Sequence, residues 1–252
     1  DSVPVTSIMY ELSQSGFATG EVASCRITHA TPAAFYAHQI NRGMDAEILS
    51  DLYKNGPDVF VAGGNKLLVP DSLTQAGYQV TYSLDSMANI ESGKVACILA
   101  EEDMPTSPMR GDTIAQGVMQ TLRLLEKNEQ GFFLMIEGAY IDKHSHSNNL
   151  YSMMCETRSL IDTIEYLYEY AADGETAVFI TADHETGSLM KANSVEEMDN
   201  FLYGSTNHSS TPVPLFVKNY VWKPENFGYR GGLTPENTAV FQACKEIITG
   251  GK

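Results

Sequence analysis

The sequence predicts an α/β fold: a doubly wound, largely parallel sheet with helices on both faces. Short apolar runs alternate with helical patterns along the chain, which is typical of strand–helix repeats. Two runs, 132–136 and 177–181, are apolar at successive positions. Strands of that kind are covered on both faces, as in a parallel sheet. With 252 residues, 43% of them hydrophobic, the chain can bury a large core, and we expect a single domain over residues 1–252.

Local signals place the elements in order. A helix is expected over residues 7–12, ending at Gly16, and a strand over 18–25. The next helix runs from Pro32 to His38, with Thr31 as its N-cap. The later expected elements are helix 45–53, strand 58–62 followed by Gly63-Gly64, strands 78–82 and 95–99, helix 112–127, strand 131–137, helix 149–172, strand 177–181, strand 213–217 and a terminal helix from Thr234 to about Gly250.

The charge balance narrows the classes of partner. Asp and Glu number 32 and Lys and Arg number 16, so the formal net charge is −16. Nucleic acid as the main partner and docking on anionic lipid are both disfavoured, because each needs a basic surface. No apolar run approaches the ~20 residues of a membrane span, so we expect no membrane partner. No signal peptide is recognisable in the sequence.

The four cysteines, Cys25, Cys97, Cys155 and Cys244, are far apart and form no CxxC pair. A cysteine zinc cluster is therefore not expected. Cys25 and Cys97 lie in apolar runs and are interpreted as core thiols. The sequence leaves open a disulfide between any two of the four.

Candidate ligands follow the predicted strands, where open α/β sheets bind their ligands. These side chains are His29, Glu137, Asp142, His146, Asp183, His184 and, in a later polar loop, His208. Asp142 and His146 share a face if their loop is helical. Asp183 and His184 converge only if the strand before them has ended. Each residue alone is more commonly a cap or turn residue, but histidine and carboxylate together suit Zn²⁺ or a harder ion.

Several of these residues lie in blocks that resemble the alkaline phosphatase family. The blocks are Arg26-Ile27-Thr28-His29-Ala30-Thr31-Pro32, Glu137-Gly138 with Ile141-Asp142-Lys143-x-x-His146, Thr181-Ala182-Asp183-His184, His208 and, more weakly, Asp58-Val59 to Gly63-Gly64. They run in family order from about Thr6 to Val217. The resemblance implies an alkaline phosphatase-like core and metal-dependent hydrolysis of phosphomonoesters.

The resemblance also implies two zinc sites. Asp142, His146 and His208 match the protein ligands of one zinc ion. Asp183 and His184 match two ligands of a second zinc ion, whose set is incomplete here.

A third site, usually a magnesium site, is implied by His29, Thr31 and Glu137. Arg42 matches the arginine that binds phosphate, which suits a guanidinium because its fork pairs with two phosphate oxygens. Two further residues flank the zinc loop, Lys143 and His144. Lys143 could reach phosphate through water, and surface solvation is the alternative for both.

The family's serine nucleophile and an aspartate that bridges two of its metal sites lie upstream of the His29 block. Ser2 does not match that serine, because Val3, Pro4 and Val5 follow it instead of small residues. The sequence thus resembles the carboxy-terminal part of an alkaline phosphatase, truncated at its N-terminus. The resemblance implies a phosphoserine route in the intact enzyme, and we expect this chain to be inactive or very weak.

Three other functions stay open. The chain could resemble a phosphodiesterase or phosphoglycerate mutase of the same superfamily, a non-catalytic metal- or phosphate-binding fragment, or a purely structural domain. The His29 block with Arg42 and Glu137 favours the phosphomonoesterase. The expected ligands are a phosphomonoester and inorganic phosphate, and the resemblance implies a periplasmic or secreted location. A missing strand would expose sheet edges, which predicts aggregation or a homodimer.

Overall fold

The chain folds into two units, which are described separately. The computed structural model describes residues 3–190, 203–221, 229–230, 234–235, 238–248 and 250. Unit 1 comprises Asp1–Tyr140 and Cys155–Thr163, and unit 2 comprises Ile141–Met154 and Ile164–Lys252. The single domain expected from the sequence stays a prediction. Among the described residues, no helix has the length and apolar character to span a membrane.

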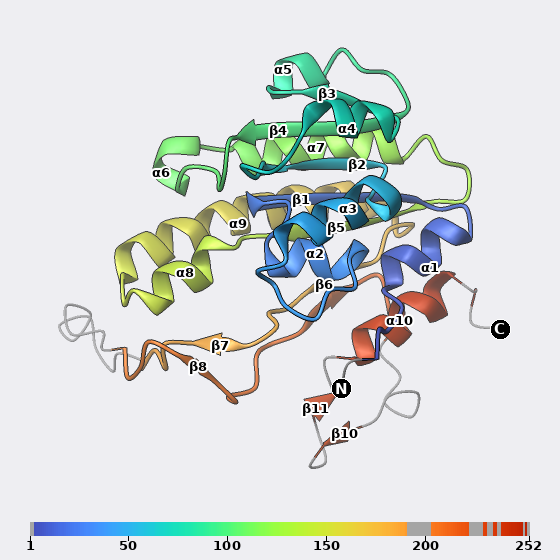
Figure 1. The fold of residues 1–252 in the computed structure, drawn as a ribbon. Coiled ribbons are helices and arrows are strands. Elements are labelled where there is room, and N and C mark those ends of the chain that lie inside the picture. Colours follow the sequence, from blue (N-terminus) through green and yellow to red (C-terminus); the bar gives the residue numbers. More distant parts are fainter. Residues whose placement is uncertain are drawn as a thin grey trace. The chain divides into compact units, whose positions relative to one another are not determined.

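A five-stranded parallel sheet with the order β3-β4-β2-β1-β5 forms the frame of unit 1 (Figure 1). Its strands are β1 (Ala18–Arg26), β2 (Val59–Gly63), β3 (Tyr78–Thr81), β4 (Lys94–Ala100) and β5 (Phe132–Glu137). The middle of β1 is buried on both faces because β1 lies between β2 and β5 and under helices. The carboxyl ends of β1 and β5 lie on the same edge, since parallel strands end together.

Helices cover both faces of this sheet. The helices of unit 1 are α1 (Ile8–Gln14), α2 (Ala30–Tyr36), α3 (Asp45–Asn55), α4 (Pro70–Gln75), α5 (Leu84–Met87), α6 (Ser107–Arg110) and α7 (Thr113–Leu125). Helices α1 to α4 share one core cluster with Ala23, Cys25 and Phe60. Helix α7 packs on the other face, where its Gly117 lies against Val22 and Val61. The doubly wound α/β fold expected from the sequence is confirmed.

Helix α2 begins two residues earlier than predicted, at Ala30 instead of Pro32. His29 is its N-cap, so the assignment of Thr31 as the cap is wrong, and Pro32 is the third helical residue. Proline is tolerated there because the first four N–H groups of a helix have no acceptor within it. The helix ends at Tyr36, and His38 is an exposed residue beyond it.

Gly63 closes β2 at a point where the backbone of another segment approaches. A Cβ atom at this position would lie 1.8 Å from the carbonyl oxygen of Glu102. Only glycine allows that approach, which explains why Gly63 and Gly64 follow the strand.

Unit 2 is built from short strand pairs and helices. Its strands are β6 (Val178–Ile180), β7 (Glu185–Thr186), β8 (His208–Ser209), β9 (Phe216–Lys218), β10 (Tyr229–Arg230) and β11 (Thr234–Pro235). Its helical elements are α8 (Tyr140–His146, whose first residue belongs to unit 1), the 3₁₀ turn η1 (Ala171–Asp173) and α10 (Ala239–Ile248). Helix α9 (Leu150–Tyr170) contributes residues to both units.

Two expectations for unit 2 are wrong. Strand β6 was expected in the parallel sheet, but it pairs antiparallel with β9. Its apolar run indicates burial and carries no information about the direction of its partner. The terminal helix begins at Ala239, and Thr234 and Pro235, expected to open it, form β11 instead. Glu236 lies outside the described residues.

Candidate metal centres

Four predicted ligands of unit 2 converge, and we call Asp142, His146, His184 and His208 the histidine cluster. Helix α8 carries Asp142 and His146 four residues apart, so the helical turn expected from their spacing is confirmed. The antiparallel pair β7–β8 carries His208, which lies opposite Thr186. A helix and a two-stranded ribbon therefore present imidazole and carboxylate groups to one another.

The donor atoms of the histidine cluster lie within reach of one ion. Asp142 Oδ1 lies 3.4 Å from His146 Nε2 and 3.6 Å from His208 Nε2. The two Nε2 atoms are 3.0 Å apart. Asp142, His184 and His208 also each offer a ligand atom, and these atoms lie within 4.8 Å of one another. Nitrogen and carboxylate donors of this kind fit zinc.

Hydrogen bonds around the cluster orient its donors. The imidazole Nδ1 of His146 lies 2.6 Å from the carbonyl oxygen of Thr206. A carbonyl can only accept, so Nδ1 donates and Nε2 keeps its lone pair toward the cluster. Thr186 Oγ1 donates to Asp142 Oδ1 at 2.6 Å and lies 3.1 Å from His184 Nδ1. Contacts of this type fix ring and carboxylate orientation in metal sites.

His184 and Asp183 follow β6, which has ended before them as their convergence requires. His184 Nε2 lies 3.1 Å from Asp183 Oδ2. The His184 ring stacks on the His208 ring with centroids 3.5 Å apart. His184 thus lies beside Asp142 and His208, which were predicted to bind the other zinc ion. The division of these residues into two zinc sites stays a prediction.

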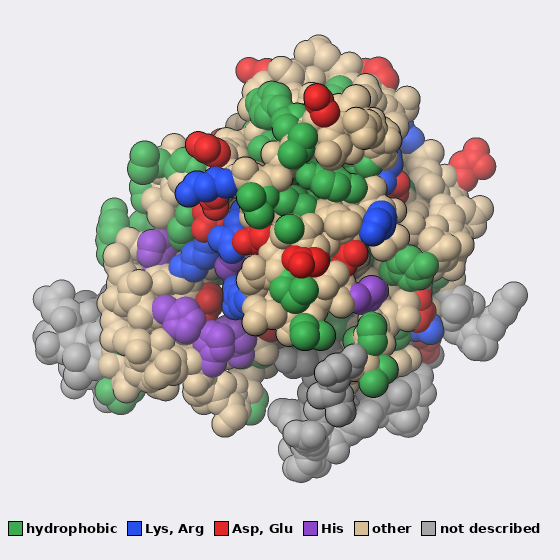
Figure 2. Space-filling model, in the orientation of Figure 1, with side chains coloured by type: hydrophobic (Ala, Val, Ile, Leu, Met, Phe, Trp, Pro, Cys, Tyr) green, Lys and Arg blue, Asp and Glu red, His purple; other side chains and the backbone are tan. Residues whose placement is uncertain are grey.

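The histidine cluster is open to solvent. The Asp183 side chain is 72% exposed and that of His208 is 46% exposed. Figure 2 shows histidine side chains gathered at the molecular surface. Lys143 and His144 are half-buried next to Asp142 on α8, and the contact of Lys143 with phosphate stays a prediction.

The ribbon beside the cluster depends on Gly187. This residue has a φ of +88°, and a Cβ there would lie 2.5 Å from Cδ1 of Tyr203. Its N–H donates to the carbonyl oxygen of Asn207 at 3.0 Å, next to His208. Glycine therefore sets the register that carries His208.

Unit 1 holds a second group, Cys25, His29 and Glu137, which we call the thiol cluster. The ligand atoms of these three residues lie within 4.8 Å of one another. The thiol of Cys25 donates to Glu137 Oε2 at 3.2 Å. His29 and Glu137 were predicted to be in one site, whereas Cys25 was interpreted as a core thiol. Cys25 is indeed fully buried, but it also faces these two ligands.

Thr31 and Arg42 were predicted to act beside His29. Thr31 is half-buried in the first turn of α2, and its role as a ligand stays a prediction. Arg42 lies beyond that helix and is exposed, yet its guanidinium reaches back, with Nη2 3.1 Å from His29 Nε2. The positively charged guanidinium group of Arg42 therefore lies at the exposed side of the thiol cluster.

A buried carboxyl group, Glu21, shares the interior of unit 1 with this cluster. Its side chain is fully buried, and neither carboxyl oxygen has a hydrogen-bond partner in the described structure. Burial, and then the charge of Glu137, raise the pKa of Glu21 well above 4.5. Glu21 is thus held as the neutral acid over a wider pH range than an exposed glutamate.

The donor set of the thiol cluster fits magnesium only in part. Magnesium prefers oxygen ligands, and of the three residues in the cluster Glu137 supplies one. The sulfur of Cys25 and the imidazole of His29 are donors that zinc accepts more readily. None of the four cysteines is in a disulfide, so the thiol of Cys25 is available as a donor.

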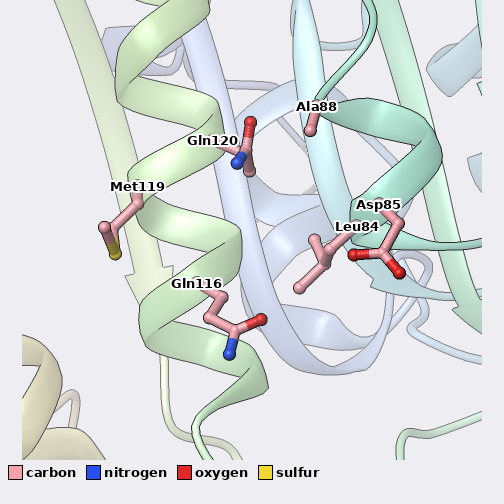
Figure 3. A pocket seen from close by; sticks show the side chains of 6 residues that line it. All are labelled: Leu84, Asp85, Ala88, Gln116, Met119 and Gln120. Atoms are coloured by element: carbon pink, nitrogen blue, oxygen red, sulfur yellow. The ribbon is translucent and has the colours of Figure 1, made fainter.

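A shallow hollow of unit 1 lies between α5 and α7 (Figure 3). Leu84, Asp85 and Ala88 line it on one side and Gln116, Met119 and Gln120 on the other. It presents one carboxylate and two amides, without imidazole or thiol, so the two clusters carry the candidate chemistry.

Comparison with known proteins assigns the family. A sequence model of the alkaline phosphatase family matches residues 1–83 and 65–245. The chain belongs to the alkaline phosphatase family. The resemblance inferred from the sequence blocks is confirmed. Alkaline phosphatase 4 of Bacillus subtilis is 29% identical over 201 residues, which cover 73% of this chain and 44% of that protein.

Solved alkaline phosphatases have the same fold. The enzyme from the Antarctic bacterium TAB5 is 33% identical, with a TM-score of 0.76 over 86% of this chain and 69% of that one. A histidine-to-aspartate variant of the TAB5 enzyme, described with magnesium bound in its M3 site, has a TM-score of 0.82 and 27% identity over 99% of this chain and 77% of that one. The chain spans about half the length of the curated alkaline phosphatases that it matches.

Proposed function

We propose that this chain is the metal- and phosphate-binding part of a phosphomonoester hydrolase of the alkaline phosphatase type. The observation that carries the proposal is the convergence of Asp142, His146, His184 and His208, whose donor atoms face one another. Family membership supplies the reaction, hydrolysis of a phosphomonoester to inorganic phosphate.

The histidine cluster is proposed to hold zinc, which supplies Lewis acidity and an activated water when bound. Asp142 provides an anionic oxygen, and Thr186 fixes its direction by donating to that oxygen. His146 provides Nε2 because Thr206 occupies its Nδ1. Asp183, next to His184, is proposed as the further carboxylate ligand of a second zinc ion.

Arg42 is proposed to bind the phosphoryl oxygens. Its planar guanidinium can donate two parallel hydrogen bonds, which matches the geometry of phosphate. His29, Thr31 and Glu137 are proposed to hold a third cation. Magnesium in the M3 site of the TAB5 variant is the precedent.

The reaction requires a nucleophile, and Ser2 does not match the serine that the family resemblance implies. We therefore propose that the chain binds metal and phosphate without turnover. A binding fragment is therefore the second candidate function, and it differs from the first only in turnover. The proposed setting is periplasmic or secreted.

The test measures zinc content and p-nitrophenyl phosphate turnover on the same purified chain. We expect zinc to bind, His208→Ala to lose the zinc of the histidine cluster, and His38→Ala, an exposed histidine outside both clusters, to keep the full zinc content. We expect no sustained turnover. Turnover at ordinary enzymatic rates (~1–10³ s⁻¹) would show that the chain contains its own nucleophile. Unchanged zinc content in the His208 variant would contradict the metal centre.

A further inference from the structure

We propose that Cys25 is a metal ligand, and that its thiol makes the third cation site of this chain select zinc or cobalt over magnesium. The inference rests on the proposed function, because it concerns the site assigned there to His29, Thr31 and Glu137. It adds a donor that the sequence blocks do not include and changes the class of ion expected.

The sheet register brings the thiol to the site. Glu137, the last residue of β5, is paired with Ala23 of β1. Cys25 follows Ala23 by two residues, so both side chains leave β1 on the same face. The Cys25 thiol therefore lies beside the Glu137 carboxylate, with 3.2 Å between Sγ and Oε2. His29 reaches the same point from the N-cap of α2.

The three donor residues differ in how deeply they are buried. Cys25 is fully buried, whereas His29 and Glu137 are half-buried. The thiol thus forms the interior wall of the cluster, and the other two donors connect it to the surface. Three protein donors leave a position open for a further ligand, as in catalytic zinc sites.

Ligand chemistry decides between the ions. Sulfur is a soft donor that binds zinc and cobalt well, while magnesium demands oxygen ligands in a near-octahedral arrangement. When the ion binds, the S–H bond breaks, a sulfur–metal bond forms, and the proton is released to solvent. The anionic oxygen of Glu137, which accepts that proton's hydrogen bond in the free chain, becomes a ligand of the same ion.

Cys97 shows how a buried thiol without such partners differs. It is fully buried in β4, and burial raises the pKa of its thiol to about 12. It is in neither of the two metal-ligand groups found among the described residues. Cys97 is therefore the matched control for Cys25: both are thiols buried in strands of the same sheet.

The experiment uses the full chain, freed of metal by a chelator and titrated with Co²⁺ alone. A cobalt–thiolate bond gives an intense near-ultraviolet absorption that nitrogen and oxygen ligands do not give. We expect this band in the wild-type chain and in Cys97→Ser, and its loss in Cys25→Ser. Losing even an outer partner of a metal ligand typically costs about 10–100-fold in affinity. We therefore expect Cys25→Ser to weaken cobalt binding at this site at least about tenfold, with magnesium binding little changed.

A second measurement needs no variant and so does not depend on the folding of Cys25→Ser. X-ray absorption of the zinc-loaded wild-type chain should show a zinc–sulfur distance of ~2.3 Å beside nitrogen and oxygen scatterers. Zinc bound only by nitrogen and oxygen, with no thiolate band for cobalt, overturns the role of Cys25 but leaves the histidine cluster intact. A chain that binds neither ion overturns this inference and the proposed function together.

Discussion

Single hydrogen bonds decide which atoms of the histidine cluster can act as ligands. Thr206 accepts from Nδ1 of His146, and Thr186 donates to the carboxylate of Asp142. The bond to Thr206 engages Nδ1 of His146 and leaves Nε2 directed at the cluster. The bond from Thr186 fixes the direction of the Asp142 carboxylate. The proposed ligand atoms are therefore oriented before any ion binds, which lowers the cost of ordering them.

Glu21 gives a prediction at the residue scale. The pKa of its buried carboxyl is raised in the folded chain, so above pH about 4.5 the unfolded chain releases this proton first. The unfolded state then binds fewer protons than the folded state, and the free energy of unfolding falls as the pH rises. The fall continues until the pH passes the raised pKa of the folded state.

The side chain at position 21 cannot titrate in the variant Glu21→Gln. Its free energy of unfolding should therefore rise relative to that of wild type as the pH rises from 5 to 8. The limit is about 1.4 kcal/mol per pH unit. Urea unfolding in the presence of a chelator measures this difference, and Glu129→Gln, at an exposed site, should follow wild type. Parallel pH profiles for Glu21→Gln and wild type would contradict the prediction. The charge of Glu137 contributes to the raised pKa of Glu21. The charge of Glu21 in turn contributes to the raised pKa values of Tyr36 and Tyr78.

Among the elements, the short helix α6 is tied to α9 by a buried ion pair. Arg110 and Glu156 have side chains that are 3% and 0% exposed and bond to each other directly. Glu156 also accepts from the Ser107 N–H at 2.6 Å, and Arg110 donates to the Pro105 carbonyl oxygen at 2.9 Å. The pair thus secures the segment that follows β4 through several hydrogen bonds at once.

Removing one partner of this pair should be costly. We expect Glu156→Gln to lower the free energy of unfolding by about 3–5 kcal/mol, because the buried guanidinium loses its counter-charge. Asp162→Asn is the matched control, since Asp162 pairs with Arg158 on the exposed face of the same helix. That change should cost less than about 1 kcal/mol. Thermal or urea unfolding of both variants measures the contrast, and equal losses would contradict it.

The strands of the parallel sheet could be predicted from the sequence because their apolar runs end in glycine and polar residues. Candidate ligands could be located because imidazole and carboxylate groups follow predicted strands, and their role as ligands stays a prediction. Sequence alone could not place Cys25 in a site, because a thiol in an apolar strand has the same pattern whether it packs or coordinates. Its position four residues before His29, at the end of the strand, was the available signal. The pairing of β6 also lay beyond the sequence, since it depends on a partner more than thirty residues away.

For the molecule as a whole, the edge of the parallel sheet in unit 1 bears on association. The sheet of unit 1 ends at β5, which pairs only with β1 among the described residues. A strand with one unpaired edge can add a strand from another chain. The repulsion from a net charge of −16 opposes such contacts, so their strength should depend on salt.

We therefore expect the chain to self-associate, and more strongly as the salt concentration rises. Sedimentation velocity over a range of protein and salt concentrations tests this, with a homodimer as the first expected species. A single monomer peak under all these conditions would show that the edge is covered.

The contact between Arg42 and His29 gives a reason to expect that cation binding and anion binding depend on each other. The lone pair of His29 Nε2, which accepts from Arg42 in the ion-free chain, can serve one partner at a time. An ion that binds through Nε2, rather than through Nδ1 of the same ring, would displace the guanidinium and leave its fork available to oxyanions. By linkage, bound phosphate should then increase the affinity for that ion by the same factor by which the ion increases the affinity for phosphate. The cation and the oxyanion would thus each favour the binding of the other, although one contacts His29 and the other contacts Arg42.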